Sequence, residues 1–189
     1  MKLSLEELRK KKLTELSLNP FQQTKFPKTI NTLLIIQQFS QFNKEELAEQ
    51  KKEVSIAGRI LRIRSFGNLT FANLADQTGI IQLKVSKNED FTELDIGDII
   101  GVKGFICKTD KGELSVEVKE FILLSKCLKP LPDTHYGFND IEERFRKRYL
   151  DFIINSEKRK IFLIRHQIIQ NARKFLDEKE FIEIETPIL

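Results

Sequence analysis

Residues 54–124 carry one aromatic side chain, Phe71, that the alternation of strand faces turns away from the predicted core. The side chains expected beside it on that outer face are polar or cationic: Arg62, Arg64, Asn73, Gln82 and Lys84. An aromatic ring can stack on an unpaired nucleobase, and amide and guanidinium groups can hydrogen-bond the base edge. This pattern therefore predicts a site for single-stranded nucleic acid.

Two predicted turns set the register of this face. The turn at residues 76–79 makes a hairpin that closes residue 75 onto residue 80, with Asn73 opposite Gln82 and Phe71 opposite Lys84. A preceding turn over residues 65–68 predicts Arg62 opposite Phe71, with Arg64 beside it.

A second interpretation of Phe71 stays open at this point. The chain contains 15 Phe and no Trp, so a single Phe is weak evidence for a binding site. In this interpretation the N-terminal helices cover Phe71, and the ring belongs to the hydrophobic core.

The elements that would position this face are five short strands. We expect them at residues 54–64, 69–75, 80–85, 99–109 and 114–124, with a helix-like piece at 89–94. Five strands with a helix after the third is the order of an OB-fold, a small barrel that often binds single-stranded nucleic acid. The predicted fold class is thus mainly β with helices.

Helices flank the predicted barrel. The N-terminal ones are expected at residues 3–18, 29–39 and 44–52, the first begun by a capping box of Ser4 and Glu7. A long helix at 157–178 and an alternating strand at 181–185 follow the barrel. We expect four parts: helical residues 1–52, the barrel at 53–128, a linker at 129–151 and the start of a second, α+β domain at 152–189. Because the last helix and strand have no sheet to join, we expect the chain to be part of a longer protein.

Charge and cysteine usage narrow the function classes. The net charge of +4 lies within residues 1–52, where ten Lys and Arg face six Asp and Glu. This suits a polyanionic partner, although a solvated helix face would look the same. Cys107 and Cys127, with His135 and His166, show no metal-ligand spacing, so we expect no zinc site. With no apolar run of about 18 residues and no secretory signal, we expect a cytoplasmic protein without a membrane partner.

Several blocks of the sequence resemble one family, the bacterial-type class II lysyl-tRNA synthetases. They are Ala57–Ile60, Asp76–Gln82, Leu94–Asp98, Lys108–Leu114, Leu123–Lys126, Pro130–Asp133 and Arg144–Asp151. The ending Phe181–Leu189 resembles class II motif 1, which builds the dimer interface in that family. Aspartyl and asparaginyl enzymes share the barrel and motif 1 but usually lack the T-x-x-G-E-L and L-x-P-L-P blocks, so the lysine enzyme is the preferred resemblance.

The resemblance implies roles for particular residues. Phe71 would stack on the central anticodon base, Arg64 and Gln82 would hydrogen-bond that base, and Glu113 would be an acidic recognition residue. Further contacts with the tRNA are expected from Arg62, Asn73, Lys84, Arg9 and Lys12. Pro187 would lie in the dimer interface.

The resemblance also implies an activity for the longer protein. That protein would attach lysine to its tRNA isoacceptor, use ATP and magnesium, and form a homodimer. Motifs 2 and 3, which hold ATP and lysine, would lie beyond residue 189. We therefore expect this chain alone to be inactive, without a catalytic residue, cofactor or metal of its own.

Three other functions stay open from the residues alone. The barrel could be the anticodon domain of an aspartyl- or asparaginyl-type enzyme, or a general module for single-stranded nucleic acid. The stripe at residues 161–175 could instead make the chain a dimerisation or partner-binding piece.

Overall fold

The computed structural model describes residues 4–15, 23, 25–86, 91, 93–132, 138 and 140–188. The chain divides into two compact units, Met1–Pro130 and Leu131–Leu189, and each is described by itself. Three sequence expectations fall partly or wholly outside the described residues: the last turn of the first helix, the helix-like piece at 89–94, and the surroundings of His135.

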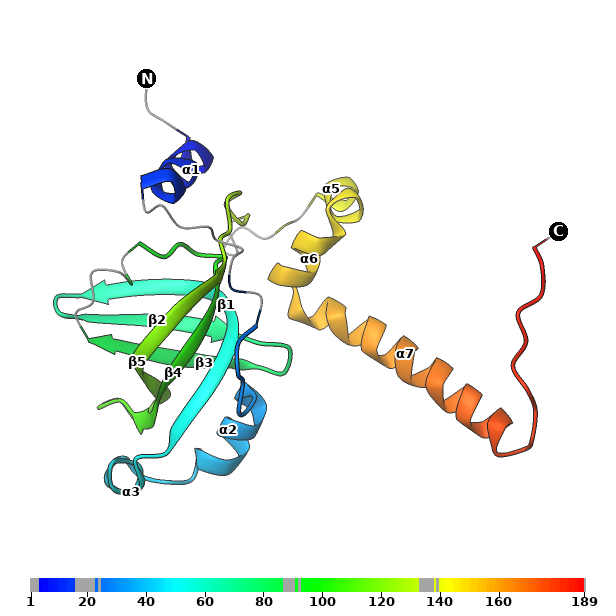
Figure 1. The fold of residues 1–189 in the computed structure, drawn as a ribbon, viewed down its shortest axis with the longest axis horizontal. Coiled ribbons are helices and arrows are strands. Elements are labelled where there is room, and N and C mark those ends of the chain that lie inside the picture. Colours follow the sequence, from blue (N-terminus) through cyan, green and yellow to red (C-terminus); the bar gives the residue numbers. More distant parts are fainter. Residues whose placement is uncertain are drawn as a thin grey trace. The chain divides into compact units, whose positions relative to one another are not determined.

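The first unit is built on a closed five-stranded barrel (Figure 1). Its strands are β1 (Glu53–Phe66), β2 (Leu69–Ala75), β3 (Ile80–Ser86), β4 (Ile99–Lys108) and β5 (Leu114–Ser125). Their order around the barrel is β1-β2-β3-β5-β4, and only the β3–β5 pair is parallel. The predicted OB-fold and its strands are confirmed.

The barrel closes around branched aliphatic side chains because inward and outward residues alternate along each strand. On β3, Ile81, Leu83 and Val85 are buried, whereas Gln82 and Lys84 are only half-buried. Phe71 is not a member of the buried core cluster. The outer face of β2 and β3 is thus left for another use.

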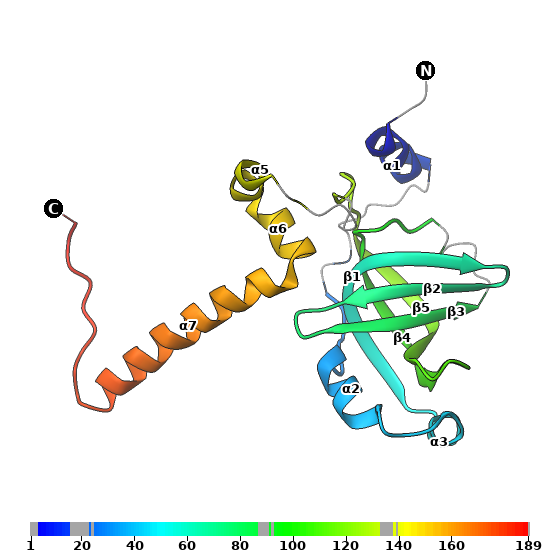
Figure 2. The ribbon, with the colours of Figure 1, turned by 180° about the vertical axis from the view of Figure 1, so that it is seen from behind.

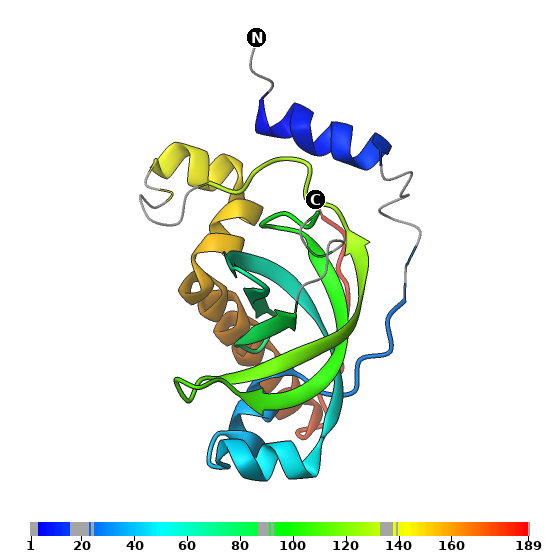
Figure 3. The same ribbon diagram turned by 90° about the vertical axis from the view of Figure 1, so that its left-hand side faces the viewer.

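Two helices cover one end of the barrel (Figures 2 and 3). They are α2 (Thr32–Phe39) and α3 (Lys44–Gln50), and Ile35 and Phe39 of α2 are buried in the core. α2 begins three residues later than predicted, because the Asn31 side chain accepts a hydrogen bond from Leu34 N–H at 2.9 Å and caps the helix there.

The first helix, α1 (Leu5–Glu15), begins at the predicted capping box. Ser4 N–H donates to Glu7 Oε2 at 2.7 Å, and Glu7 N–H donates to Ser4 Oγ at 3.2 Å. Two of the otherwise unpaired donors at the helix start are satisfied in this way.

The register of the first hairpin differs from the prediction. β1 continues through Phe66, so the turn holds only Gly67 and Asn68, and Gly67 has the positive φ of 57° that such a turn requires. Arg64 therefore pairs with Phe71, and Arg62 pairs with Asn73. The expected placement of Arg62 opposite Phe71 is wrong by two residues, whereas the predicted β2–β3 register is confirmed.

In its described residues the second unit has three helices, α5 (Ile141–Arg146), α6 (Arg148–Ile154) and α7 (Ser156–Asp177). Asp151 is fully buried and accepts hydrogen bonds from Arg144, Arg148 and Asn155. The long helix is confirmed, but the strand predicted at 181–185 is wrong, since residues 179–188 have no helix or strand. Alternation alone does not make a strand, because its backbone groups need a neighbouring strand to pair with, and the described part of this unit has none. No helix in the described ranges is long and apolar enough to cross a membrane.

Candidate nucleic-acid interface

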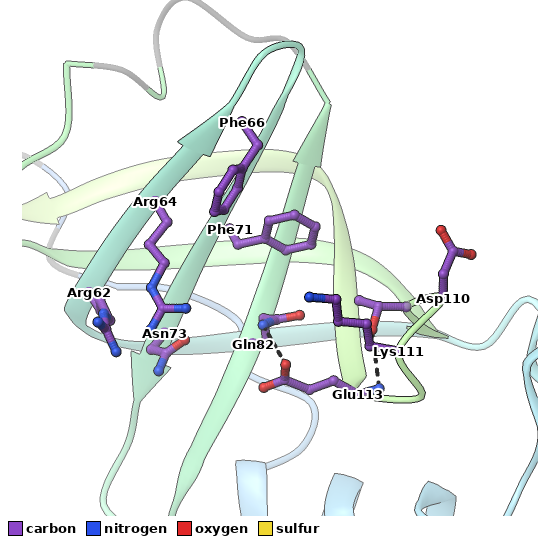
Figure 4. Close-up of a pocket in the computed structure, with 10 residues that line it drawn as sticks. Arg62, Arg64, Phe66, Phe71, Asn73, Gln82, Asp110, Lys111 and Glu113 are labelled. Atoms are coloured by element: carbon purple, nitrogen blue, oxygen red, sulfur yellow. Dashed lines mark hydrogen bonds between the residues drawn. The ribbon is translucent and has the colours of Figure 1, made fainter.

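A pocket of about 410 Å³ lies on the outer face of the barrel (Figure 4). Its lining comes from β1, β2, β3 and the loop between β4 and β5: Arg62, Arg64, Phe66, Phe71, Asn73, Gln82, Thr109, Asp110, Lys111 and Glu113. In Figure 4 the two arginines and Asn73 lie on one side of Phe71, and the β4–β5 loop lies on the other. Six residues that were predicted from the sequence to form the site line this pocket.

The Phe71 ring is half-buried and faces the pocket. It packs edge-to-face against Phe66, with ring centroids 6.3 Å apart and an interplanar angle of 60°. Phe66 is 63% exposed at the tip of the β1–β2 hairpin. Phe71 therefore lies at the surface of the barrel. The alternative interpretation had placed it in the core beneath the N-terminal helices.

Gln82 and Glu113 come together across the parallel β3–β5 pair, where Gln82 is in register with Ser115. Gln82 Nε2 donates to Glu113 Oε2 at 2.8 Å, and Ser115 Oγ donates to Gln82 Oε1 at 2.9 Å. Ser115 is fully buried. These bonds turn the amide oxygen of Gln82 toward Ser115 and its N–H group toward Glu113 and the pocket (Figure 4).

Two guanidinium groups line the pocket from β1. Arg64 pairs with Phe71 in the ladder and Arg62 pairs with Asn73, and both arginines are exposed. Within the described ranges, neither guanidinium has an ion-pair partner in the protein. Their donors are free for a ligand rich in acceptors, such as a nucleobase edge or a phosphate.

Three cations expected to contact nucleic acid lie outside this pocket. Lys84 pairs with Glu117 at 2.8 Å, and this hydrogen bond raises the pKa of Lys84. Arg9 is only 8% exposed, and its guanidinium donates to the carbonyl oxygens of Cys127 at 2.8 Å and Ile96 at 3.1 Å. Lys12 lies 3.7 Å from Asp95. These hydrogen bonds fix α1 to the barrel.

Four lining residues were not predicted: Phe66, Thr109, Asp110 and Lys111. The sequence predicts a turn at Phe66, whereas β1 extends through this residue. Lys111 lies two residues before Glu113 in the T-x-x-G-E-L block, and this proximity was the available signal.

Asp76 holds the β2–β3 turn that sets the register of the site. Its Oδ1 accepts from Thr78 N at 2.7 Å, Gly79 N at 3.0 Å and the hydroxyls of Thr32 and Thr78. Its Oδ2 accepts from Thr32 N at 3.0 Å and Lys28 Nζ at 2.9 Å. Burial alone would raise the pKa of Asp76, but these hydrogen bonds outweigh it and hold the pKa well below the usual range. The carboxylate joins the start of α2 to the turn.

The described residues contain no group of three or more His, Cys, Asp or Glu side chains that could hold a metal ion.

The fold and the pocket define an OB-fold domain of the nucleic-acid-binding class. Residues 54–124 match the family model described as OB-fold nucleic acid binding domain. Residues 140–189 match the model described as tRNA synthetases class II (D, K and N).

Similar curated proteins carry one name. The chain is 44% identical over 178 residues to a lysine–tRNA ligase of Halalkalibacterium halodurans, which covers 90% of this chain and 35% of that protein. It is 44% identical over 188 residues to the lysine–tRNA ligase of Mycoplasma mycoides subsp. mycoides, covering 95% of the chain and 38% of the relative. For the lysine–tRNA ligase of Staphylococcus haemolyticus the identity is 43% over 196 residues, with 97% and 39% covered.

The chain belongs to the lysyl-tRNA synthetase family of class II synthetases. It spans a little over a third of the length of the curated relatives it matches, between 35% and 39% for those named above.

Proposed function

We propose that the barrel at residues 53–128 binds the anticodon of a tRNA, with the lysine isoacceptor as its cognate. The longer protein would attach lysine to that tRNA with ATP and magnesium. The observation that carries this proposal is the position of Phe71, a surface aromatic ring with hydrogen-bonding side chains on both sides. Membership of the lysyl-tRNA synthetase family supports the choice of tRNA over other single strands.

The proposed interaction starts with stacking. A base turned out of the anticodon loop lies on the ring of Phe71, and its edge meets Gln82 and Glu113. Ser115 donates to the amide oxygen of Gln82, so the amide is oriented with its NH2 group toward the pocket, and one of the two N–H hydrogens is already used by Glu113. The second hydrogen is free to donate to a base carbonyl.

The carboxylate supplies the complementary group. Glu113 Oε2 accepts from Gln82, which leaves Oε1 to accept a hydrogen bond from the base. Uracil presents a carbonyl oxygen next to N3–H, so it can accept from Gln82 and donate to Glu113. In the same pose cytosine places its unprotonated N3 against the carboxylate. Arg64 can donate to a second uracil carbonyl, and a mismatch that leaves these groups unpaired costs about 1–3 kcal/mol.

The second unit bears on the assembly of the longer protein. The apolar side chains along α7 are exposed, for example Ile161 at 58%, Ile168 at 63% and Phe175 at 59%. We propose that this stripe and Pro187 belong to a homodimer interface. The boundaries 1–52, 53–128, 129–151 and 152–189 remain our proposed division of function along the chain.

The experiment is binding of a fluorescent anticodon stem-loop of lysine tRNA, measured by anisotropy for the wild type and Phe71→Ala. Loss of a stacking partner should weaken binding roughly 5- to 150-fold, equivalent to about 1–3 kcal/mol per base. Phe181→Ala is the matched control, because Phe181 is 65% exposed and belongs to the second unit. Unchanged affinity, or loss of the barrel's circular dichroism in Phe71→Ala, would contradict the proposal.

A second arm tests base selection. Stem-loops with uracil or cytosine at the central anticodon position, and an oligo-dT of equal length, are compared on wild type and Glu113→Gln. We expect the wild type to prefer uracil, and Glu113→Gln to reduce that preference because an amide can donate to cytosine N3. Equal binding of oligo-dT and both stem-loops by the wild type would instead identify a sequence-tolerant single-strand module.

A further inference from the structure

The loop between β4 and β5 brings one cation, Lys111, to the pocket from the side opposite the two arginines (Figure 4). We propose that Lys111 binds a phosphate group of the single-stranded nucleic acid seated on Phe71. This inference rests on the proposed function, because it concerns the same pocket. It assigns the backbone contact on this side of the bound nucleotide.

The loop is held in a defined shape, so that the position of Lys111 is constrained. Thr109 N–H donates to Glu113 O at 3.0 Å, and Gly112 N–H donates to Thr109 O at 2.8 Å. Glu113 N–H also donates to Thr109 Oγ1 at 3.1 Å. Gly112 has a φ of +79°, which favours glycine at this tight turn.

The acidic groups near Lys111 are already paired with other residues. Asp110 accepts a hydrogen bond from Lys44 at 2.5 Å, which lowers the pKa of Asp110 and raises that of Lys44. Glu113 accepts from Gln82. Among the residues that the structure describes, Lys111 has no ion-pair or hydrogen-bond partner, so its charge is available to a ligand.

The arrangement favours phosphate over a base edge as the partner of Lys111. Gln82 and Glu113 already supply a donor and an acceptor for the base edge. A nucleotide inside a strand has a phosphate on each side of its sugar, and the pocket has cations on both sides: Arg62 and Arg64 on one, Lys111 on the other. A compact, strongly hydrated ammonium is suited to a phosphate oxygen, and grooves for single strands commonly combine cations with stacking rings.

The test is the salt dependence of stem-loop binding for the wild type and Lys111→Gln. One lost phosphate contact should reduce the slope of log Kd against log salt by about 0.7. The same slope predicts about 8-fold weaker binding at 50 mM salt and about 3-fold at 200 mM. Lys119→Gln is the control, because Lys119 lies over the Phe105 ring and does not line the pocket, so its slope should stay that of the wild type.

Lys111→Arg keeps the charge and should retain the wild-type slope, which separates a phosphate contact from damage to the loop. An unchanged slope in Lys111→Gln would overturn the inference, as would a loss of uracil preference with the slope intact, since that result would place Lys111 on the base. The two proposals fail separately. If Phe71→Ala binds with normal affinity while Lys111→Gln shows the reduced slope of log Kd against log salt, the stacking proposal is wrong and the phosphate contact is supported.

Discussion

Replacing Asp76 by Asn should destabilise the barrel without removing any residue from the pocket. The carboxylate is 4% exposed and accepts hydrogen bonds on both oxygens. If the amide nitrogen of Asn takes the place of Oδ2, Thr32 N–H loses its acceptor at 3.0 Å. A part-buried donor without a partner costs about 1–3 kcal/mol. Lys28 can return to water, so its loss adds little.

The remaining hydrogen bonds weaken as well, because bonds to a charged group contribute about 1.5–3 kcal/mol and neutral ones about 1 kcal/mol. Together these effects predict a loss of about 2–3 kcal/mol in the free energy of unfolding. With a urea m-value of about 1–3 kcal/mol per molar, the unfolding midpoint should fall by about 0.7–3 M.

Urea unfolding followed by circular dichroism gives the midpoint, and amide hydrogen exchange over residues 69–86 localises the effect to the β2–β3 hairpin. The control is Asp110→Asn, because Asp110 is 92% exposed and should change stability by less than about 0.5 kcal/mol. Equal midpoints for Asp76→Asn and Asp110→Asn would refute the reasoning.

The same variant makes a prediction about pH. The pKa of Asp76 is lower in the folded protein than in the unfolded chain, so its contribution is fully present above the unfolded pKa of about 3.9. That contribution is lost as the pH falls through the lower, folded pKa. The stability gap between wild type and Asp76→Asn should therefore be constant above about pH 5 and shrink below about pH 3.9. A gap that widens on acidification would contradict the assignment of the lowered pKa.

Two further predictions concern Arg9, which the sequence predicts at the nucleic acid but the structure places against the barrel, and Ser115, which the sequence does not predict to be part of the site. Arg9→Gln should lower the free energy of unfolding by about 1–3 kcal/mol while stem-loop affinity, measured by anisotropy, stays within about twofold, because the guanidinium bonds two carbonyl groups of the barrel. A large affinity loss with normal stability would place Arg9 on the nucleic acid. Ser115→Ala frees the Gln82 amide to rotate, so uracil-over-cytosine preference should fall about 5-fold, equivalent to about 1 kcal/mol, with the salt slope unchanged. Full preference in that variant would show that Glu113 alone orients Gln82.

Local patterns predicted the strands well, because each depends on the alternation of its own residues. On β3 the buried Ile81, Leu83 and Val85 alternate with Gln82 and Lys84, and the turn at 76–79 sets their register against β2. The first hairpin was misplaced by two residues because the segment around Gly67 does not show where the strand stops. Ser65 pairs with Thr70, and Phe66 with Leu69, only when β1 runs to its observed end.

Contacts between segments that lie far apart in the sequence could not be predicted from such local patterns. Arg9 and Lys12 look alike on a helix rich in lysine, and only the packing of α1 turns Arg9 into the barrel while Lys12 stays partly exposed. The bond from Ser115 to Gln82 joins residues 33 positions apart. It depends on a parallel strand pair that no periodicity in either strand predicts.

The arrangement of Gln82, Ser115 and Glu113 in the candidate site depends on the parallel pairing of β3 and β5. β3 and β5 meet over only three register pairs, at Gln82, Leu83 and Lys84, whereas the antiparallel ladders that flank them are longer. Gln82 lies on the β3 side of this seam, the short parallel pairing of β3 with β5, and Ser115 and Glu113 lie on the β5 side. Opening of the seam would separate the amide from both groups that orient it, while Phe71 and Arg64 on the β1–β2 hairpin would stay together. Stacking and base selection are thus supported by different parts of the barrel. A change that loosens β3 from β5 should reduce discrimination between bases before it reduces affinity for a single strand.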